Sequence, residues 1–592
     1  MNSNLSSNSQ NNRLIFIQKN FDLIVICILI LATLIINYRM IKQGVNGTGD
    51  VRWHLAWIQH FYQQITEGVW YPRWLSGTNF GYGSPTFVFY PPLIYYLGSI
   101  LRLIGFNIEQ AMTILLTLAI FLSGLTFYIY GRNRWDKLAA LVGALYFMNT
   151  PAIIAYANGG VILNLFAVAL IPLGAYLTEQ SMTKPKARIS LAIFWTVIAF
   201  THTPSFLLWT IAFLGYLLFF LTKYSYKSVL ATLLSSMLGW GMASIYLVPA
   251  ILEKSSVNID YPRLSKGGFE MLDLLELFKS GISDITNKQL LAVLTMAIIC
   301  FLGYRHNQSK IKETFGWLIF IGIVLFFISN LSWTIWRSSI TLQTVETSWR
   351  IGGLLYFGTA GLSALAVSSI FQLKLPLKLF LSVIIASIIM MNFQYGYSLT
   401  RQNPTLHSGG KGKVFVKQWL ETIFYDPYSD KLIDVPEFRP LIHDKIPSNY
   451  PRERYTDAGI PYIEKGSPSF PIPALGEPRY SLVQGKAEIV QSKWENYERE
   501  FKITVTETST IKIRTYTYPA WHLYVNNQSH PILQADDGTI LFNLEPGSYQ
   551  VVLRYDWTPA FKAGVVLSIL SFGALMVLKG IYATSKRSES IT

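Results

Sequence analysis

The chain has 592 residues, of which 51% are hydrophobic and only 14% are charged, whereas a soluble globular protein is usually about 25% charged. This composition excludes an ordinary soluble enzyme and predicts a polytopic α-helical membrane protein. The net charge of +15 comes from Lys and Arg residues that lie between hydrophobic segments instead of in one basic arm, so it predicts membrane topology and no nucleic-acid partner. The two cysteines, Cys27 and Cys300, lie in hydrophobic segments and predict no disulfide framework.

The hydrophobic segments predict about twelve membrane spans, because roughly 20 apolar residues cross the hydrocarbon core. The spans lie near residues 21–37, 111–130, 138–157, 160–178, 189–203, 205–222, 228–251, 289–304, 314–332, 351–370, 379–395 and 560–581. Arg13 and Lys19 precede the first span, and no small-residue cleavage site follows it. We therefore expect a cytoplasmic tail at residues 1–20 and an uncleaved signal anchor.

Segment 86–106 is apolar but contains Pro91, Pro92 and Arg102. If this segment lies in the membrane surface, the basic clusters between the spans all fall on the cytoplasmic side. If it crosses the membrane, they all fall outside, against the positive-inside rule. The first external loop is therefore predicted to run from about residue 38 to 110, within a transmembrane domain at residues 21–395.

After residue 395 the composition changes to that of a soluble domain, first with many prolines and then with alternating strands. Phe501, Ile503 and Val505 alternate with polar residues, and so does the run from Tyr549 to Tyr555. This period of two, with Asn, Gly and Pro at the turns, predicts a β-sandwich. We expect residues 396–558 to lie outside the membrane and residues 559–592 to form the last span and a cytoplasmic tail.

The first loop carries the most distinctive candidate residues. Asp50 and His54 are one helical turn apart, and Trp53, Trp57, Phe61 and Ile65 form a stripe at helical spacing. The stripe predicts an amphipathic helix on the bilayer surface. Two interpretations of Asp50 remain open, because Asp is both a favoured helix N-cap and a candidate general base.

Other candidate residues lie in further loops or near the ends of spans. An external loop near residues 333–350 brings Glu346 and Arg350 to the membrane surface, where an Arg is either an interfacial anchor or a ligand contact. His202 is expected at the external end of its span, as a satisfied interfacial histidine or as a ligand. The remaining spans contain almost no ionisable residues, which disfavours an ion-coupled transporter.

An external site has no access to cytoplasmic nucleotide-activated donors, so group transfer there requires a lipid-linked phosphate donor. Asp50 would then be the general base that activates an acceptor hydroxyl. Arg73 and Arg350 would hold the departing phosphate, because guanidinium groups match phosphate oxygens. His54 would orient Asp50, bind phosphate or join a metal, and two such groups do not establish a metal site.

Several motifs resemble those of the bacterial membrane family called 6-pyruvoyl-tetrahydropterin synthase-related. They are GDVRWHL, YPRWL and GYGSPTFVFYPPLIYYLG in the first loop, THTPS at 201–205 and SWRIGGLL at 348–355. The family is similar in architecture to the GT-C glycosyltransferases, which use polyprenyl-phosphate sugar donors and carry an acid in the first external loop. By this resemblance Asp50 matches the acid and Arg350 a donor-phosphate contact. A second acid has no clear match, which leaves a divalent metal ion open as a cofactor.

The leading hypothesis is an inverting GT-C-type glycosyltransferase in the cytoplasmic membrane, acting on a glycan, glycolipid or protein acceptor at the external face. Further substrate contacts are assigned to a set of polar and aromatic residues: Arg52, Tyr82, Tyr90, His202 and Glu346. Two alternatives stay open. One is a transporter or flippase for a lipid-linked glycan, and the other is a non-catalytic assembly or binding protein.

Overall fold

The structure is a computed structural model that describes residues 20–46, 50–257, 271–273, 285–343, 345, 347–402, 454–455, 461–462 and 477–589. In these residues, 7 helices are long and apolar enough to cross a membrane, or up to 9 if each of two bent helix pairs forms one span. The remaining three of the twelve predicted spans coincide with shorter helices, at Asn20–Ile36, Pro185–Thr201 and Lys288–Gly303. The chain is thus a polytopic helical membrane protein.

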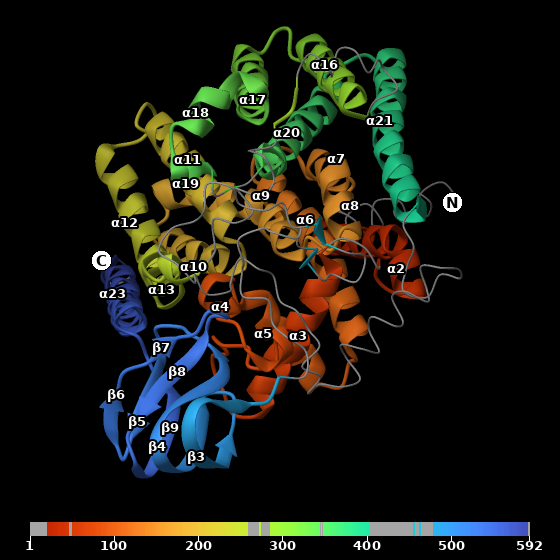
Figure 1. Ribbon diagram of the computed structural model, residues 1–592. Helices are drawn as coiled ribbons and strands as arrows, with labels where there is room; N and C mark the ends of the chain where they lie inside the picture. Colours follow the sequence, from red (N-terminus) through yellow and green to blue (C-terminus); the bar gives the residue numbers. More distant parts are fainter. Residues whose placement is uncertain are drawn as a thin grey trace, which may run out of the picture. The chain divides into compact units, whose positions relative to one another are not determined.

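The chain divides into two compact units, and the first consists of Met1–Val51, Glu109–Thr183 and Glu270–Lys413. Besides the helix at Asn20–Ile36, its described helices, labelled in Figure 1, are α2 (Tyr38–Gln43), α6 (Ile108–Arg132), α7 (Lys137–Met148), α8 (Pro151–Asn158), α9 (Ile162–Thr183), α16 (Ile285–Gly303), α17 (Gln308–Ile328), α18 (Trp333–Arg337), α19 (Ile340–Gln343), α20 (Gly352–Ile370) and α21 (Leu375–Gln402). Short 3₁₀ turns at Asn330–Ser332 (η3) and Ser348–Ile351 (η4) precede α18 and α20.

Helix α20 lies at the centre of the first unit and packs against α7, α9, α16 and α17. Small residues allow this close approach: a Cβ on Gly353 would lie 2.6 Å from Val168 Cγ2 of α9, and one on Gly361 would lie 2.7 Å from the Trp317 ring of α17. The span predicted at 138–157 is bent, because α7 and α8 meet at an angle of 43°. Pro151 is the first residue of α8. The N–H groups at this position have no partner within a helix, so the missing N–H of proline costs no hydrogen bond.

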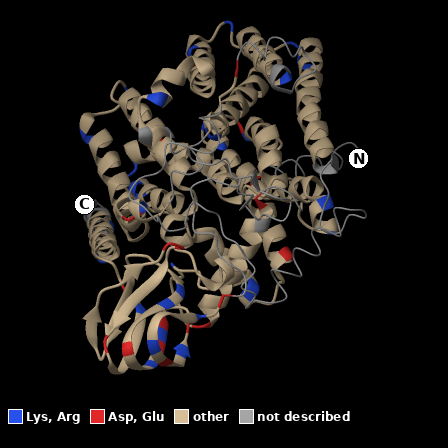
Figure 2. Cartoon of the chain, viewed as in Figure 1, with Lys and Arg blue, Asp and Glu red and all other residues tan. Residues whose placement is uncertain are grey.

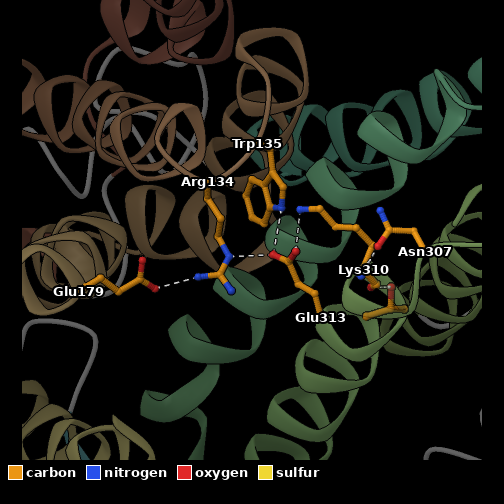
Figure 3. Close-up of polar contacts among 7 residues, drawn as sticks. Arg134, Trp135, Glu179, Asn307, Lys310 and Glu313 are labelled. Atoms are coloured by element: carbon orange, nitrogen blue, oxygen red, sulfur yellow. Dashed lines mark hydrogen bonds and ion pairs between the residues drawn. The ribbon is translucent and has the colours of Figure 1, made fainter. Parts of the chain in front are cut away.

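Charged residues are rare along these helices and gather at their ends and in loops (Figure 2). In one such cluster, Arg134 Nη1 lies 2.9 Å from Glu179 of α9 and its Nε lies 2.8 Å from Glu313 of α17 (Figure 3). Trp135 Nε1 and Lys310 Nζ also donate to Glu313, at 3.1 and 2.9 Å. This network ties the turn after α6 to α9 and α17, and the positive-inside rule predicts that it is cytoplasmic.

The second unit consists of Arg52–Ile108, Lys184–Phe269 and Val414–Thr592. Its described helices are α3 (Val51–Thr66), η1 (Asn79–Gly81), α4 (Thr86–Phe89), α5 (Leu93–Leu103), α10 (Pro185–Thr201), α11 (Thr203–Phe220), α12 (Tyr226–Met242), α13 (Ser244–Leu252), η2 (Lys254–Ser256) and α23 (Pro559–Glu589). Segment 86–106 thus forms two short helices on either side of Pro91 and Pro92. Neither helix is long enough to cross the hydrocarbon core.

Helix α3 buries the apolar stripe that the sequence predicted. Trp57 is 3% exposed and Phe61 is fully buried. The Trp57 ring lies 4.6 Å from Tyr90, and the Phe61 ring lies 4.8 Å from Phe87 of α4. The stripe therefore contacts α4 and its neighbourhood instead of lipid, and the expectation that its apolar face lies on the bilayer surface is wrong. Helix α3 is instead part of the protein interior.

The C-terminal part of this unit is an antiparallel sheet of seven strands. They are β3 (Tyr480–Trp494), β4 (Glu498–Tyr516), β5 (Trp521–Val525), β6 (Gln528–His530), β7 (Leu533–Gln534), β8 (Thr539–Leu544) and β9 (Gly547–Tyr555). Strand β4 pairs with β3 along one edge and, along the other, with β9 in its first half and β8 in its second half. All seven strands of this domain are therefore linked through β4. A separate two-stranded pair, β1 (Arg454–Tyr455) and β2 (Pro461–Tyr462), precedes them.

The predicted alternation in β4 is confirmed, since Phe501, Ile503 and Val505 are buried and the residues between them are exposed. The predicted turn at Asn526 and Asn527 is also present, and both residues have positive φ, as a tight hairpin turn requires.

Within the second unit, this β domain contacts the first loop, and Figure 1 shows its blue strands beside α3, α4 and α5. The Trp74 ring is fully buried and lies 5.5 Å from Trp521, and the Tyr82 ring lies 5.0 Å from Tyr516. The Tyr516 N–H also donates to the Tyr82 carbonyl at 2.8 Å. These contacts join residues more than 400 positions apart and place the motifs YPRWL and GYGSP against the C-terminal domain.

Candidate functional site

Asp50 directly precedes α3, and its side chain is exposed. Its backbone N–H donates to the Gly159 carbonyl at 3.0 Å, at the turn between α8 and α9. Gly160 has φ +68, and a Cβ there would lie 2.6 Å from the Val51 nitrogen. Because only glycine tolerates both that backbone angle and that closeness, the turn at 159–160 fixes the position of Asp50.

Arg350 lies in the 3₁₀ turn η4, and its side chain is half-buried. The neighbouring Trp349 ring lies 5.5 Å from the Tyr156 ring of α8, and the Tyr156 hydroxyl donates to the Trp349 carbonyl at 3.4 Å. Ser348 Oγ donates to the Ile328 carbonyl at 2.6 Å and holds the turn to the end of α17.

Helix α8 therefore holds two of the predicted site residues in place within the first unit. Its C-terminal turn binds the Asp50 backbone, and Tyr156, one turn earlier, contacts the segment that carries Arg350. Tyr156 and Asn158 were not predicted from the sequence. The signal that marks their helix is the interruption of the hydrophobic segment by Pro151, Gly159 and Gly160.

His54 lies in α3 in a different environment from Asp50. Its side chain is 2% exposed, and Nδ1 lies 2.8 Å from the Tyr95 hydroxyl of α5. Burial lowers the pKa of His54 to about 3, so the imidazole is neutral at pH 7. A neutral imidazole offers no cationic contact to a phosphate. The hydrogen bond to Tyr95 joins α3 to α5, and a catalytic role of His54 stays a prediction.

Arg73 is also buried, at 4% exposure. Its guanidinium carbon lies 3.7 Å from the centre of the Phe561 ring in α23 and 5.2 Å from that of Tyr555 in β9. Its backbone N–H donates to the Tyr497 hydroxyl at 2.6 Å. The arginine of the YPRWL motif is thus held between the β domain and the last helix.

Three predicted substrate contacts also lie in the second unit. Tyr82 is 1% exposed and pairs with Tyr516, as described above, and Tyr90 packs on Trp57. His202 is 8% exposed, and its Nδ1 lies 2.7 Å from Ser205 Oγ and accepts from the Ser205 N–H at 3.3 Å. His202 therefore caps the start of α11, and its role as a ligand contact stays a prediction.

The THTPS motif also binds the first loop. Thr203 Oγ1 lies 2.6 Å from the Tyr246 hydroxyl of α13, and Tyr246 donates to the Phe89 carbonyl at the end of α4 at 2.7 Å. Two further predicted contacts, Glu346 and the side chain of Arg52, lie outside the described residues. Because Asp50 and Arg350 belong to one unit and Arg73 to the other, the expected convergence of all three remains a prediction.

One buried acid was not predicted from the sequence. Glu253, just after α13, is 8% exposed, and its carboxylate accepts hydrogen bonds from the Tyr518 and Thr558 hydroxyls. Glu253 therefore connects the end of α13 to the β domain and to the start of α23. Its only signal in the sequence is an acid at the end of an apolar run. Among the described residues, no group of three or more His, Cys, Asp or Glu could hold a metal ion.

A protein-family model described as "6-pyruvoyl-tetrahydropterin synthase related domain; membrane protein" matches residues 87–398, more than half of the chain. The chain belongs to this family of membrane proteins. The range matched by the family model includes Tyr90, His202 and Arg350, whereas Asp50 and Arg73 precede it. No curated protein matches the chain significantly.

Solved structures of membrane glycosyltransferases resemble this family member at low identity. Arabinofuranosyltransferase AftD from Mycobacteria has 13% identity and a TM-score of 0.43, with 67% of this chain and 28% of that chain covered. The Archaeoglobus fulgidus oligosaccharyltransferase in its apo form has 14% identity and a TM-score of 0.43, with coverage of 74% and 62%. ArnT from Cupriavidus metallidurans bound to undecaprenyl phosphate has 12% identity and a TM-score of 0.29, with coverage of 59% and 78%.

This family member thus spans less than a third of the AftD chain and 62% of the oligosaccharyltransferase chain.

Proposed function

We propose that this protein is a membrane glycosyltransferase that transfers a sugar from a polyprenyl-phosphate-linked donor to an acceptor at the external face of the cytoplasmic membrane. The acceptor would be a cell-surface glycan, glycolipid or protein. The observation that supports this proposal most is that Asp50 and the segment that carries Arg350 both contact the C-terminal half of α8 or the turn after it; Asp50 is exposed and Arg350 is half-buried.

In the proposed reaction, Asp50 takes a proton from an acceptor hydroxyl, and the hydroxyl oxygen attacks the anomeric carbon of the donor sugar. The bond between that carbon and the phosphate oxygen breaks, and its electron pair leaves with the polyprenyl phosphate. Arg350 binds the phosphate through the forked N–H groups of its guanidinium, which match phosphate oxygens. Attack from the face opposite the phosphate gives inversion at the anomeric carbon.

The proposal is tested by replacing Asp50 with Asn and measuring sugar transfer from polyprenyl-phosphate donors in vesicles. Loss of a general base is expected to lower turnover by about 10²–10⁴-fold. Arg350→Lys keeps the positive charge but removes the paired N–H groups of the guanidinium. We expect it to lower the rate of transfer from the donor by roughly tenfold or more. Unchanged transfer by folded Asp50→Asn protein would show that Asp50 is not the base and would favour its role as a helix cap.

A transporter for lipid-linked glycans is the main alternative. In the described residues, charged side chains gather at helix ends and in loops (Figure 2), and this scarcity within the spans disfavours an ion-coupled transporter. Movement of a fluorescent lipid-linked glycan across vesicles containing only this protein, unaffected by Asp50→Asn, would support transport instead.

A further inference from the structure

Arg499 of β4 is the most unusual charged residue among those described. Its side chain is completely buried, and none of its three guanidinium nitrogens has a hydrogen-bond partner. The guanidinium carbon lies 4.6 Å from the centre of the Trp494 ring and 4.5 Å from that of Trp521. The two aromatic rings thus contact the cation, but its N–H donors remain unsatisfied.

The nearest charges make this arrangement less favourable. Arg479 lies 5.3 Å from the Trp494 ring. Arg514, whose backbone N–H donates to the Arg479 carbonyl at 2.9 Å, is 7% exposed. No described carboxylate forms an ion pair with Arg499. Burial, and then the charges of Arg479 and Arg514, lower the pKa of Arg499 to about 9. The guanidinium still carries its charge at pH 7.

Such a group costs the folded domain free energy. A cation–π contact contributes about 2 kcal/mol when desolvated, whereas an isolated buried charge costs several kcal/mol unless it is paired and hydrogen-bonded. The aromatic contacts therefore offset part of this cost. They leave the N–H groups in the guanidinium plane without hydrogen-bond acceptors. Carboxylate and phosphate oxygens are the acceptors that match these groups in pairs.

We propose that the cluster formed by Arg479, Trp494, Arg499 and Trp521 binds an acidic sugar unit, one that carries a carboxylate or phosphate. The cluster reaches the surface, since Arg479 is exposed and Trp494 is half-buried. Arg479 and Arg499 both lie against the Trp494 ring. In the proposed site an anionic group therefore binds beside Arg479 and pairs with the N–H donors of Arg499, and the exposed part of Trp494 contacts the sugar ring. The choice of a sugar over a lipid headgroup rests on the proposed function, which makes a glycan the substrate.

Binding is measured by calorimetry on the full chain in detergent, with trigalacturonate as the acidic probe and its uncharged carboxyl-reduced counterpart as the control. We expect only the acidic probe to bind. Arg499→Met removes the charge and keeps most of the stem volume, and it should weaken binding by roughly tenfold or more, the value of a hydrogen-bonded charge pair. Without ligand, Arg499→Met should raise the melting temperature, because it removes an uncompensated buried charge.

The matched control is Arg554→Met, which removes an arginine of β9 that pairs with Glu498 at 3.0 Å on the same domain. This variant should bind the acidic probe like the wild type. If Arg499→Met fails to fold, the exposed Arg479→Met variant provides the test, and it should lower affinity without loss of folding.

Three results would overturn the proposal. The first is equal binding of both probes, and the second is a lower melting temperature for Arg499→Met with unchanged binding, which would make the cluster a structural cation–π stack. The third is binding only to vesicles of anionic lipid, which would identify a lipid surface as the ligand. Asp50→Asn should still bind the acidic probe, so a failure of the transfer reaction and a failure of this site can be told apart.

Discussion

At the scale of single residues, side chains of the same type have different surroundings in different parts of the fold. Arg350 is half-buried at the end of a turn, whereas Arg73 lies between the Phe561 and Tyr555 rings at 4% exposure. Buried cation–π contacts of this kind stabilise a fold. Arg73 therefore contributes to the attachment of the β domain to the first loop, which adds a structural role to the phosphate-binding role that its sequence motif predicts.

His54 gives a prediction about pH at this scale. Its pKa is lowered to about 3 by burial, so between about pH 3 and the ordinary value near 6.5 the unfolded chain binds a proton that the folded chain does not. The free energy of unfolding should therefore decrease as the pH falls below about 6.5, by up to about 1.4 kcal/mol per pH unit. His60, with a pKa lowered to about 4 by burial, acts in the same direction.

We expect the melting temperature of His54→Gln to depend less on pH between about 6.5 and 5 than that of the wild type. Tyr95→Phe is the control, since it removes the hydrogen bond and leaves the buried histidine. It should lower the melting temperature at every pH and keep the slope. An unaltered slope in His54→Gln would show that this histidine is not protonated on unfolding.

At the scale of elements, α8 and the turn that follows it have more influence on the candidate site than their length suggests. The helix has 8 residues, too few to be stable alone, so its place depends on packing. Gly396 of α21 approaches Ile154, and Asn46 Nδ2 donates to the Asn158 carbonyl at 2.8 Å. These contacts hold the middle and the C-terminal end of the helix that contacts Asp50 and the segment of Arg350.

Gly160→Ala tests this element. Positive φ costs a non-glycine residue about 1–2 kcal/mol, and the added Cβ would also meet the backbone of Val51. We therefore expect a lower melting temperature and a loss of transfer activity. Gly316→Ala in α17 is the matched control, since nothing lies within 4 Å of its Cβ position. Alanine should be neutral there or stabilise the helix by up to about 1 kcal/mol. Wild-type stability and activity in Gly160→Ala would contradict the assigned role of the turn.

At the scale of the whole molecule, the distribution of basic residues predicts the topology. We expect the turn at Asn526 in the β domain to be external and the loop that contains Ser225 to be cytoplasmic. With Cys27 and Cys300 replaced by Ser, single cysteines at positions 526 and 225 can be labelled by a membrane-impermeant maleimide. Intact cells should label position 526, and position 225 should react only after permeabilisation. The reverse pattern would place the β domain in the cytoplasm and exclude the proposed external reaction.

Much of the fold could be predicted from local patterns. Hydrophobic runs predicted the long helices, and the bend between α7 and α8 lies where Pro151 interrupts one of these runs. Alternating residues in β4 and the Asn526–Asn527 turn predicted the β domain. The prediction was wrong for the apolar stripe of α3, since a sequence pattern shows that a face is apolar and cannot show whether protein or lipid covers it.

The sequence by itself determined that this protein is a helical membrane protein with a C-terminal β domain, because hydrophobicity and period are properties of neighbouring residues. Only the tertiary structure decided that Arg73 is enclosed by rings of β9 and α23, that Glu253 binds two distant hydroxyls, and that Arg499 is buried without an acceptor. The physical reason is that burial and hydrogen bonding depend on residues hundreds of positions away, and these come together only when the chain folds.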